Sequence, residues 1–180
     1  MPPDEAAVIR LTRIALSRLL AYREAAEKQA PDPHGRTLDL ATSNALRLFD
    51  ACASARTILC HGAGQAVATL AAATAGKLVL ATENGPEAAQ RLQARMDALA
   101  PASPVLAVSK GPKPFDFWSE PWFRHPDLVV LGGGSAEPLG ALRARILMPT
   151  RVLILPAADA RASEGMTEVE LFPLPSTIPS

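Results

Sequence analysis

From residue 56 onward, short apolar runs alternate with stretches of helical periodicity. Each run is bounded by Gly, Pro or polar residues, and none alternates strictly between apolar and polar positions. Strands that crossover helices bury on both faces have this pattern. We therefore predict strands at Thr57–Cys60, Lys77–Ala81, Val105–Ser109, Asp127–Leu131 and Arg151–Leu155, with helices at about 65–75, 86–100 and 136–147.

The order of these segments predicts an α/β fold. A β-α-β-α-β run, then a longer connection and a final β-α-β unit, is typical of a doubly wound, mostly parallel sheet. Right-handed crossovers give the strand order 3-2-1-4-5 with helices on both faces. The last 25 residues hold one possible strand, Thr167–Phe172, and then a proline-rich tail, so we expect a shortened C-terminus.

The N-terminal part of the chain has a different pattern. Residues 4–30 have apolar positions at roughly helical spacing, and Pro31 and Pro33 end the helix that this spacing predicts. A second helix is expected at 38–54. We therefore divide the chain into an N-terminal helix and linker at 1–35 and an α/β domain at 36–180.

Composition and charge exclude several classes of protein. Its 180 residues are 48% hydrophobic and 20% charged, which suits one globular domain. Eighteen basic and eighteen acidic side chains cancel, so we expect no nucleic-acid partner. No apolar run approaches the roughly 18 residues of a membrane helix, and no signal-peptide pattern begins the chain. We therefore expect a cytoplasmic protein with no membrane partner.

The segment with most chemical information is the glycine turn after the first predicted strand. Gly62 allows a tight turn there, and Gly64 allows a ligand to approach the backbone. His61 adjoins the turn, where it either contacts a ligand or caps the strand end. Glu83 follows Gly62 by 21 residues, where an acid can accept hydrogen bonds from both ribose hydroxyls. This pattern predicts a nucleoside site; alternatively, the glycines serve only close helix–strand packing and Glu83 is a solvated loop acid.

The residues after Glu83 extend this pattern. The helical segment Gly85–Met96, the strand and turn in His125–Gly133 and the strand in Arg151–Pro156 follow in order. This arrangement resembles the class I S-adenosylmethionine-dependent methyltransferases over about residues 38–160. Nicotinamide-dependent dehydrogenases share its first half but usually have a third glycine, where this chain has Val67.

The resemblance implies a Rossmann-like methyltransferase fold and S-adenosylmethionine as the cofactor. Its acid after strand two implies that Glu83 binds the adenosine ribose. With the glycine turn and the turn after strand four, the expected cofactor-binding residues are His61, Gly62, Gly64, Glu83 and Gly132. No catalytic residue is identified.

The sequence also departs from this family. Cys60 stands where the first strand commonly carries an acid that contacts the methionine end of the cofactor. Strand four is followed by Gly132-Gly133-Gly134-Ser135, where the family usually has an Asp. Two functions therefore stay open: methyl transfer to an unknown acceptor, or a catalytically inactive methyltransferase-fold protein that acts as a structural or interaction subunit. A nicotinamide-dependent oxidoreductase is a third, weaker alternative.

Two segments are candidate protein-binding surfaces. Aromatic side chains gather in residues 115–123, where they either line an acceptor pocket, bind a protein, or cover the end of the sheet. The apolar stripe of the leading helix, especially Leu16, Leu19 and Leu20, is expected to contact a second chain, such as a copy in a homodimer.

We expect neither a disulfide framework nor a metal site. Two cysteines, Cys52 and Cys60, are too few for a disulfide framework. His34 and His125 have no nearby Cys or His with which to bind a metal. Consecutive strand residues point to opposite faces, so Cys60 and His61 are not expected to act as a nucleophile–base pair.

Overall fold

The computed structural model describes residues 13–14, 16–18, 20–21, 24, 42–62, 78–99, 105–110, 125–133, 138–157 and 165–174. The described residues between 13 and 24 are helical, as expected. Gly64, the expected helix at 65–75 and the aromatic segment 115–123 lie outside the described residues. Association through the leading helix or the aromatic segment stays a prediction.

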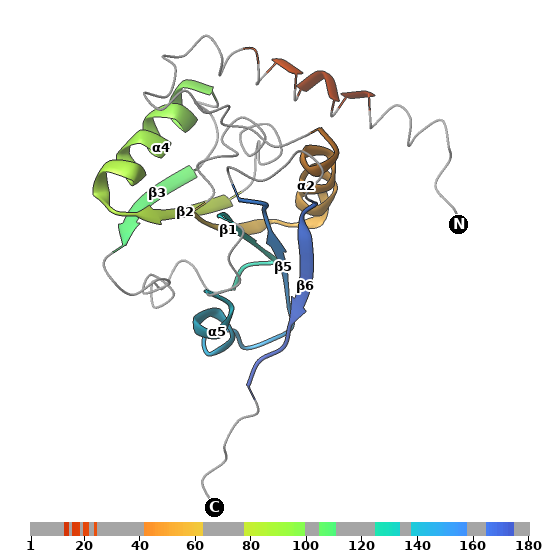
Figure 1. Ribbon diagram of the computed structural model, residues 1–180, viewed down its shortest axis with the longest axis vertical. Coiled ribbons are helices and arrows are strands. Elements are labelled where there is room, and N and C mark those ends of the chain that lie inside the picture. The colour runs from red at the N-terminus through yellow and green to blue at the C-terminus, as the bar shows by residue number, and fades with distance from the viewer. Residues whose placement is uncertain are drawn as a thin grey trace, which may run out of the picture.

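A six-stranded sheet forms the centre of the molecule, in the order β3-β2-β1-β4-β5-β6 (Figure 1). β1 to β5 are parallel, and β6 pairs antiparallel with β5. The predicted order 3-2-1-4-5 is confirmed, and the strand expected at Thr167–Phe172 becomes the edge strand of the described sheet. The bounds are β1 Thr57–His61, β2 Leu78–Asn84, β3 Val105–Lys110, β4 Leu128–Leu131, β5 Thr150–Ile154 and β6 Thr167–Leu171.

Helices cover both faces of the sheet. α2 (Thr42–Ser54) and α4 (Pro86–Leu99) lie on one side and α5 (Pro138–Arg143) on the other (Figure 1). The expected helix at 136–147 was too long, because the chain turns after Arg143. The amide of Ile146 bonds the carbonyl of Leu142, and Ile146 is buried before the chain enters β5.

Alternate residues of each central strand enter two separate cores. On the α2 and α4 side, Ile58 and Cys60 of β1 pack with Leu48 of α2 and Leu92 and Met96 of α4. On the other side lie Leu59, Leu80, Val129, Leu131 and, from α5, Leu142. Because both faces are buried, these strands show no alternation of apolar and polar residues in the sequence.

Polar contacts tie α2 to the far edge of the sheet. The buried Asn44 side chain accepts a hydrogen bond from the amide of Met166 (3.1 Å), just before β6. Arg47 donates to the carbonyl oxygen of Met166 (2.9 Å). α2 thus fixes the start of the last described strand, 119 to 122 residues later in the sequence.

Among the described residues, no helix has the length and apolar character needed to cross a membrane. The same part of the chain contains no group of three or more side chains suited to hold a metal ion. Cys52 and Cys60 are buried and are not joined in a disulfide.

Candidate functional site

Four of the five expected cofactor-binding residues meet at the carboxyl edge of the parallel sheet. His61 ends β1 and lies beside Thr82 of β2 and Leu131 of β4 in the strand register. Glu83 follows Thr82, and Gly132 follows Leu131. Ligands of open α/β sheets bind at this edge, where the strand order reverses between the first and fourth strands.

Backbone hydrogen bonds hold the two turns at this edge in place. The amide of Gly62 donates to the carbonyl oxygen of Thr82 (2.9 Å), and the amide of Gly132 donates to that of His61 (2.8 Å). Gly62 has a φ of +63°, which side chains with a Cβ rarely adopt. The turn after β1 therefore requires glycine at this position, as the sequence predicted.

Glu83 is half-buried near the end of β2. By strand alternation its side chain lies on the α2 and α4 face, together with those of Val79 and Ala81. Gly85, with a φ of +104°, donates its amide to the carbonyl oxygen of Glu83 (3.0 Å). The chain therefore turns sharply after the acid and begins α4 at Pro86. The sequence interpretation overlooked this turn, although its Gly-Pro dipeptide is a recognised turn signal.

His61 and Thr82 form a polar pair on the opposite face. The Nδ1 atom of His61 lies 2.7 Å from the hydroxyl oxygen of Thr82, and that hydroxyl donates to the carbonyl oxygen of Cys60 (3.3 Å). Burial lowers the pKa of His61 below its ordinary value, which favours the neutral imidazole. Thr82 is almost wholly buried and was not among the residues expected at the site.

Cys60 occupies the position of the family's first-strand acid but lies in the core, where only 1% of its surface is exposed. Burial raises the pKa of its thiol well above the ordinary value, and the nearby Cys52 and Glu83 raise it further. The side chain is therefore a neutral packing group. The next residue, His61, lies on the opposite face, where its ring bonds to Thr82.

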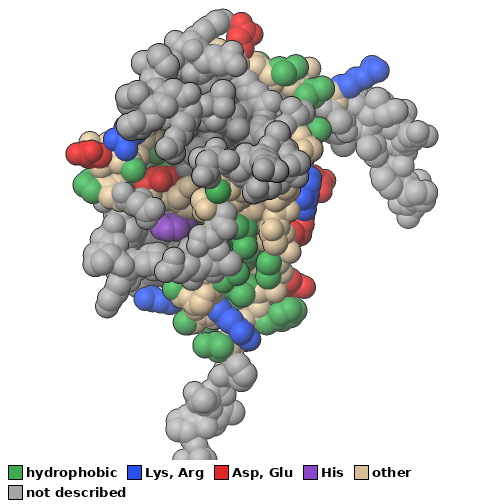
Figure 2. All heavy atoms as spheres, in the orientation of Figure 1, with side chains coloured by type: hydrophobic (Ala, Val, Ile, Leu, Met, Phe, Trp, Pro, Cys, Tyr) green, Lys and Arg blue, Asp and Glu red, His purple; other side chains and the backbone are tan. Residues whose placement is uncertain are grey.

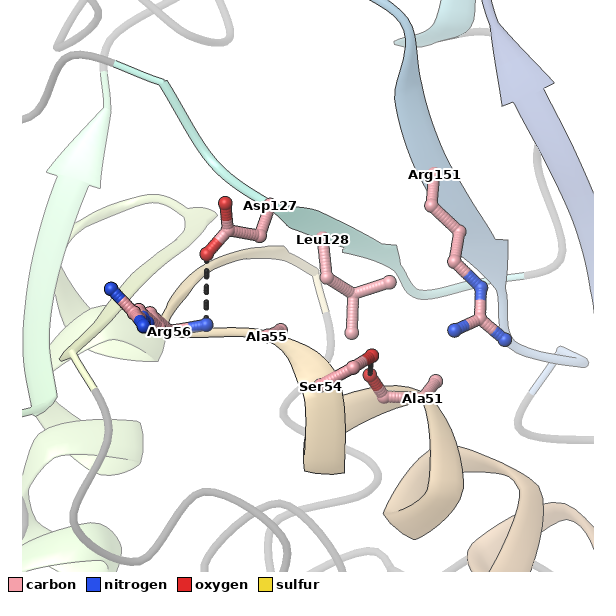
Figure 3. Close-up of a pocket in the computed structure, with 7 residues that line it drawn as sticks. All are labelled: Ala51, Ser54, Ala55, Arg56, Asp127, Leu128 and Arg151. Carbon is pink, nitrogen blue, oxygen red and sulfur yellow. Dashed lines mark hydrogen bonds between the residues drawn. The ribbon is translucent and has the colours of Figure 1, made fainter. Parts of the chain in front are cut away.

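The described cavities lie elsewhere. One, of about 330 Å³, opens at the amino edge of the sheet beside Asp127 and Arg151 (Figure 3). Asp127 accepts hydrogen bonds from the amides of Arg56 (2.8 Å) and Thr57 (3.1 Å), and Arg151 forms an ion pair with Glu168. A second, of about 250 Å³, adjoins it between α2 and β5. The Asp127 carboxylate and the Arg151 guanidinium of the first cavity are thus engaged within the fold.

No family model matches this sequence, and neither does any curated protein. Solved structures do match its fold. A methyltransferase-like protein from Silicibacter pomeroyi is 20% identical, with a TM-score of 0.57 over 78% of this chain and 90% of that one. A candidate O-methyltransferase from Klebsiella pneumoniae is 17% identical, with a TM-score of 0.51 over 86% of this chain and 66% of that one. The chain has the Rossmann-like fold of the class I S-adenosylmethionine-dependent methyltransferases, as the sequence resemblance implied.

Proposed function

We propose that this chain binds S-adenosylmethionine at the carboxyl edge of β1, β2 and β4 and transfers its methyl group to an acceptor. The observation that carries the proposal is the position of Glu83. Its carboxylate stands half-buried at the end of β2, next to a glycine turn that the Gly62–Thr82 hydrogen bond fixes against that strand. A carboxylate there accepts hydrogen bonds from both hydroxyls of a ribose.

The residues at the adenosine end fit this cofactor. Glu83 supplies the charged acceptor, and Gly62 supplies a turn with open space beside it. Apart from Gly62 and its two chain neighbours, no atom of the described residues lies within 4 Å of the position that a Cβ on Gly62 would take. Gly132 and Gly133 form the neighbouring turn after β4, where Gly133 has a φ of +81°. Among the described residues, glycine backbone therefore borders the site between β1 and β4.

When bound, the cofactor supplies an electrophilic methyl group on a sulfonium. In our proposal the chain's own part is to hold the ribose on Glu83 and to keep His61 neutral beside the site. In-line transfer needs mainly positioning and exclusion of water. A proton acceptor is required only where the methyl acceptor must first lose a proton.

The alternative is a methyltransferase-fold protein without turnover, and Cys60 is the observation that favours it. A buried, protonated thiol cannot replace an acid that binds the methionine end of the cofactor. Under this alternative the chain binds S-adenosylhomocysteine or S-adenosylmethionine through Glu83 but releases no methylated product. Methyl-transfer assays with protein extracts and hydroxyl-bearing small molecules as acceptors separate the two functions.

Calorimetric titration of the purified chain with S-adenosylmethionine and S-adenosylhomocysteine tests cofactor binding. Glu83→Gln removes the charge while nearly preserving shape, and we expect binding to weaken about 10- to 100-fold. Glu87→Gln is the matched control, since this exposed acid at the start of α4 pairs only with the exposed Arg91 among the interactions that the structure gives. A parent chain that binds neither ligand, or a Glu83→Gln variant that binds as tightly as the parent, contradicts the proposal.

A further inference from the structure

Four large hydrophobic side chains are exposed at one end of the sheet. Leu147 is 83% exposed, Met148 55%, Phe172 54% and Leu174 53%. Two other large hydrophobic residues are exposed in the described part of the chain, Ile14 and Leu20, and both belong to the N-terminal segment. Single exposed apolar residues are ordinary, but a contiguous group marks an interaction site. We call Leu147, Met148, Phe172 and Leu174 the end patch.

The fold brings the two halves of the end patch together from distant parts of the sequence. Leu147 and Met148 lie just before β5, and Phe172 and Leu174 lie just after β6. Thr150 and Leu171 are partners in the antiparallel β5–β6 register, so the flanking residues lie at the same end of both strands.

Side-chain hydrogen bonds fix this end further. Arg143 donates from Nε to the carbonyl oxygen of Phe172 (3.1 Å), and Thr150 donates its hydroxyl to the carbonyl oxygen of Met148 (3.0 Å). Both halves of the end patch are therefore held by the folded domain. Little ordering is then required when a partner binds, which lowers the entropic cost of association.

Two arginines of the described part of the chain border the end patch. Arg143 and Arg145 are exposed at the end of α5 and in the turn that leads to the patch. In Figure 2, basic and hydrophobic side chains lie side by side at this lower end of the molecule. In β6, Glu168 pairs with Arg151, and Glu170 lies by alternation on the same face of the strand as Glu168.

We propose that the end patch is a docking site for an acidic, apolar segment of another protein. Apolar side chains of such a segment would cover Leu147 and Phe172, while its carboxylates would face Arg143 and Arg145. A second copy of this chain is less suitable, because a two-fold contact sets the patch against itself and brings arginines against arginines. A lipid surface is also less suitable, since stable membrane attachment requires more apolar or basic groups than these.

The end patch lies at the amino end of β5, whereas His61, Glu83 and Gly132 lie at the carboxyl edge of strands parallel to it. Docking at the end patch therefore does not depend on cofactor binding. A failure of one proposal leaves the other standing.

Selection from a phage-displayed library of short random peptides on the full chain tests this proposal. A Leu147→Ser, Phe172→Ser variant serves for counter-selection. We expect the enriched peptides to combine acidic with apolar residues and to lose about tenfold or more in affinity for that variant. Charge reversal by Arg143→Glu and Arg145→Glu should weaken the same peptides. Leu20→Ser and Arg91→Glu are matched controls outside the patch, and they should leave binding unchanged.

Thermal unfolding of each variant verifies that it is folded. If the Arg143→Glu variant is unfolded, because Arg143 also bonds Phe172, the Arg145→Glu variant alone tests the charge. Three results would overturn the proposal. The first is the absence of peptides that prefer the parent to the counter-selection variant, or enrichment of peptides without acidic residues. The second is patch-dependent binding to phosphatidylserine vesicles, and the third is self-association that the Leu147→Ser, Phe172→Ser variant abolishes.

Discussion

The side chains of His61 and Thr82 connect β1 to β2 on the face of the sheet opposite to Glu83, with 2.7 Å between Nδ1 and the hydroxyl oxygen. The Thr82 hydroxyl donates its one hydrogen bond to the carbonyl oxygen of Cys60, so it accepts a hydrogen bond from the imidazole. The neutral ring therefore carries its hydrogen on Nδ1. Since the amide of Gly62 bonds the carbonyl oxygen of Thr82, one residue of β2 fixes both the strand end and the turn after it.

Thr82→Val should destabilise the protein by about 1–3 kcal/mol, because two buried hydrogen-bonding groups lose their partner. Urea denaturation measures this change. Thr82→Ser is the control: it keeps the hydroxyl, and nitrogen chemical shifts of the imidazole should still report a proton on Nδ1. The relationship would be refuted by a Val variant whose His61 tautomer and stability both match those of the parent.

His61 should make stability depend on pH in a definite direction. Burial lowers the pKa of the folded imidazole, whereas the unfolded chain titrates near 6.5. The unfolded state therefore binds more protons in the window below pH 6.5, so stability falls as the pH decreases through it, by at most about 1.4 kcal/mol per pH unit from this group.

Urea midpoints between pH 5 and 7.5 for the parent and His61→Gln measure this dependence. The variant should show a smaller loss of stability on acidification. Glu168 does not interfere, since its pKa is lowered by the Arg151 hydrogen bond and its contribution is lost only below about pH 4.5. Equal pH dependence in parent and variant would contradict the assignment.

Restoring the family's acid at position 60 should harm this protein. Cys60→Asp would place a carboxylate in a core that exposes 1% of the side chain, near the charge of Glu83. We expect a loss of stability of about 3 kcal/mol or more, and no gain in cofactor affinity. Cys60→Ala, which only shortens the side chain, should cost about 1 kcal/mol. A stable Cys60→Asp variant with tighter binding of S-adenosylmethionine would show that this position faces the cofactor.

The strand pattern was predictable because two buried faces leave a recognisable apolar run. The strand predicted at Thr57–Cys60 is one residue shorter than β1, which ends at His61. The order of five strands followed from right-handed crossovers. β2 was harder: the apolar run stopped at Ala81, but the strand continues to Asn84 because β3 pairs with it to Lys110. Pairing between strands is a tertiary effect, and local hydrophobicity does not report it.

The candidate site was only partly predictable for a similar reason. Gly62 and Glu83 are evident from their types and spacing, since a turn needs glycine and a ribose needs an acceptor. Thr82 gave no such signal, because its role comes from the strand register that sets it beside His61. The end patch also depends on register: Leu147 and Phe172 are 25 residues apart in the sequence, and the β5–β6 pairing brings their segments together.

The last prediction concerns Asp127, which the sequence placed inside the fourth strand but which lies in the bend before it. Its carboxylate accepts hydrogen bonds from the amides of Arg56 and Thr57, and its own amide donates to the carbonyl oxygen of Thr57 (2.9 Å). The residue therefore joins the start of β1 to that of β4, at the edge opposite the candidate site (Figure 3).

Asp127→Ala should lower the free energy of unfolding by about 1–2 kcal/mol in urea denaturation, because two amides at the start of the central strand lose a charged acceptor. Asp127→Asn, which keeps one acceptor oxygen, should cost less, and Asp97→Ala on the exposed side of α4 should stay within about 0.5 kcal/mol of the parent. Equal stability of the Asp127→Ala and Asp97→Ala variants would show that the strand starts are held by other contacts.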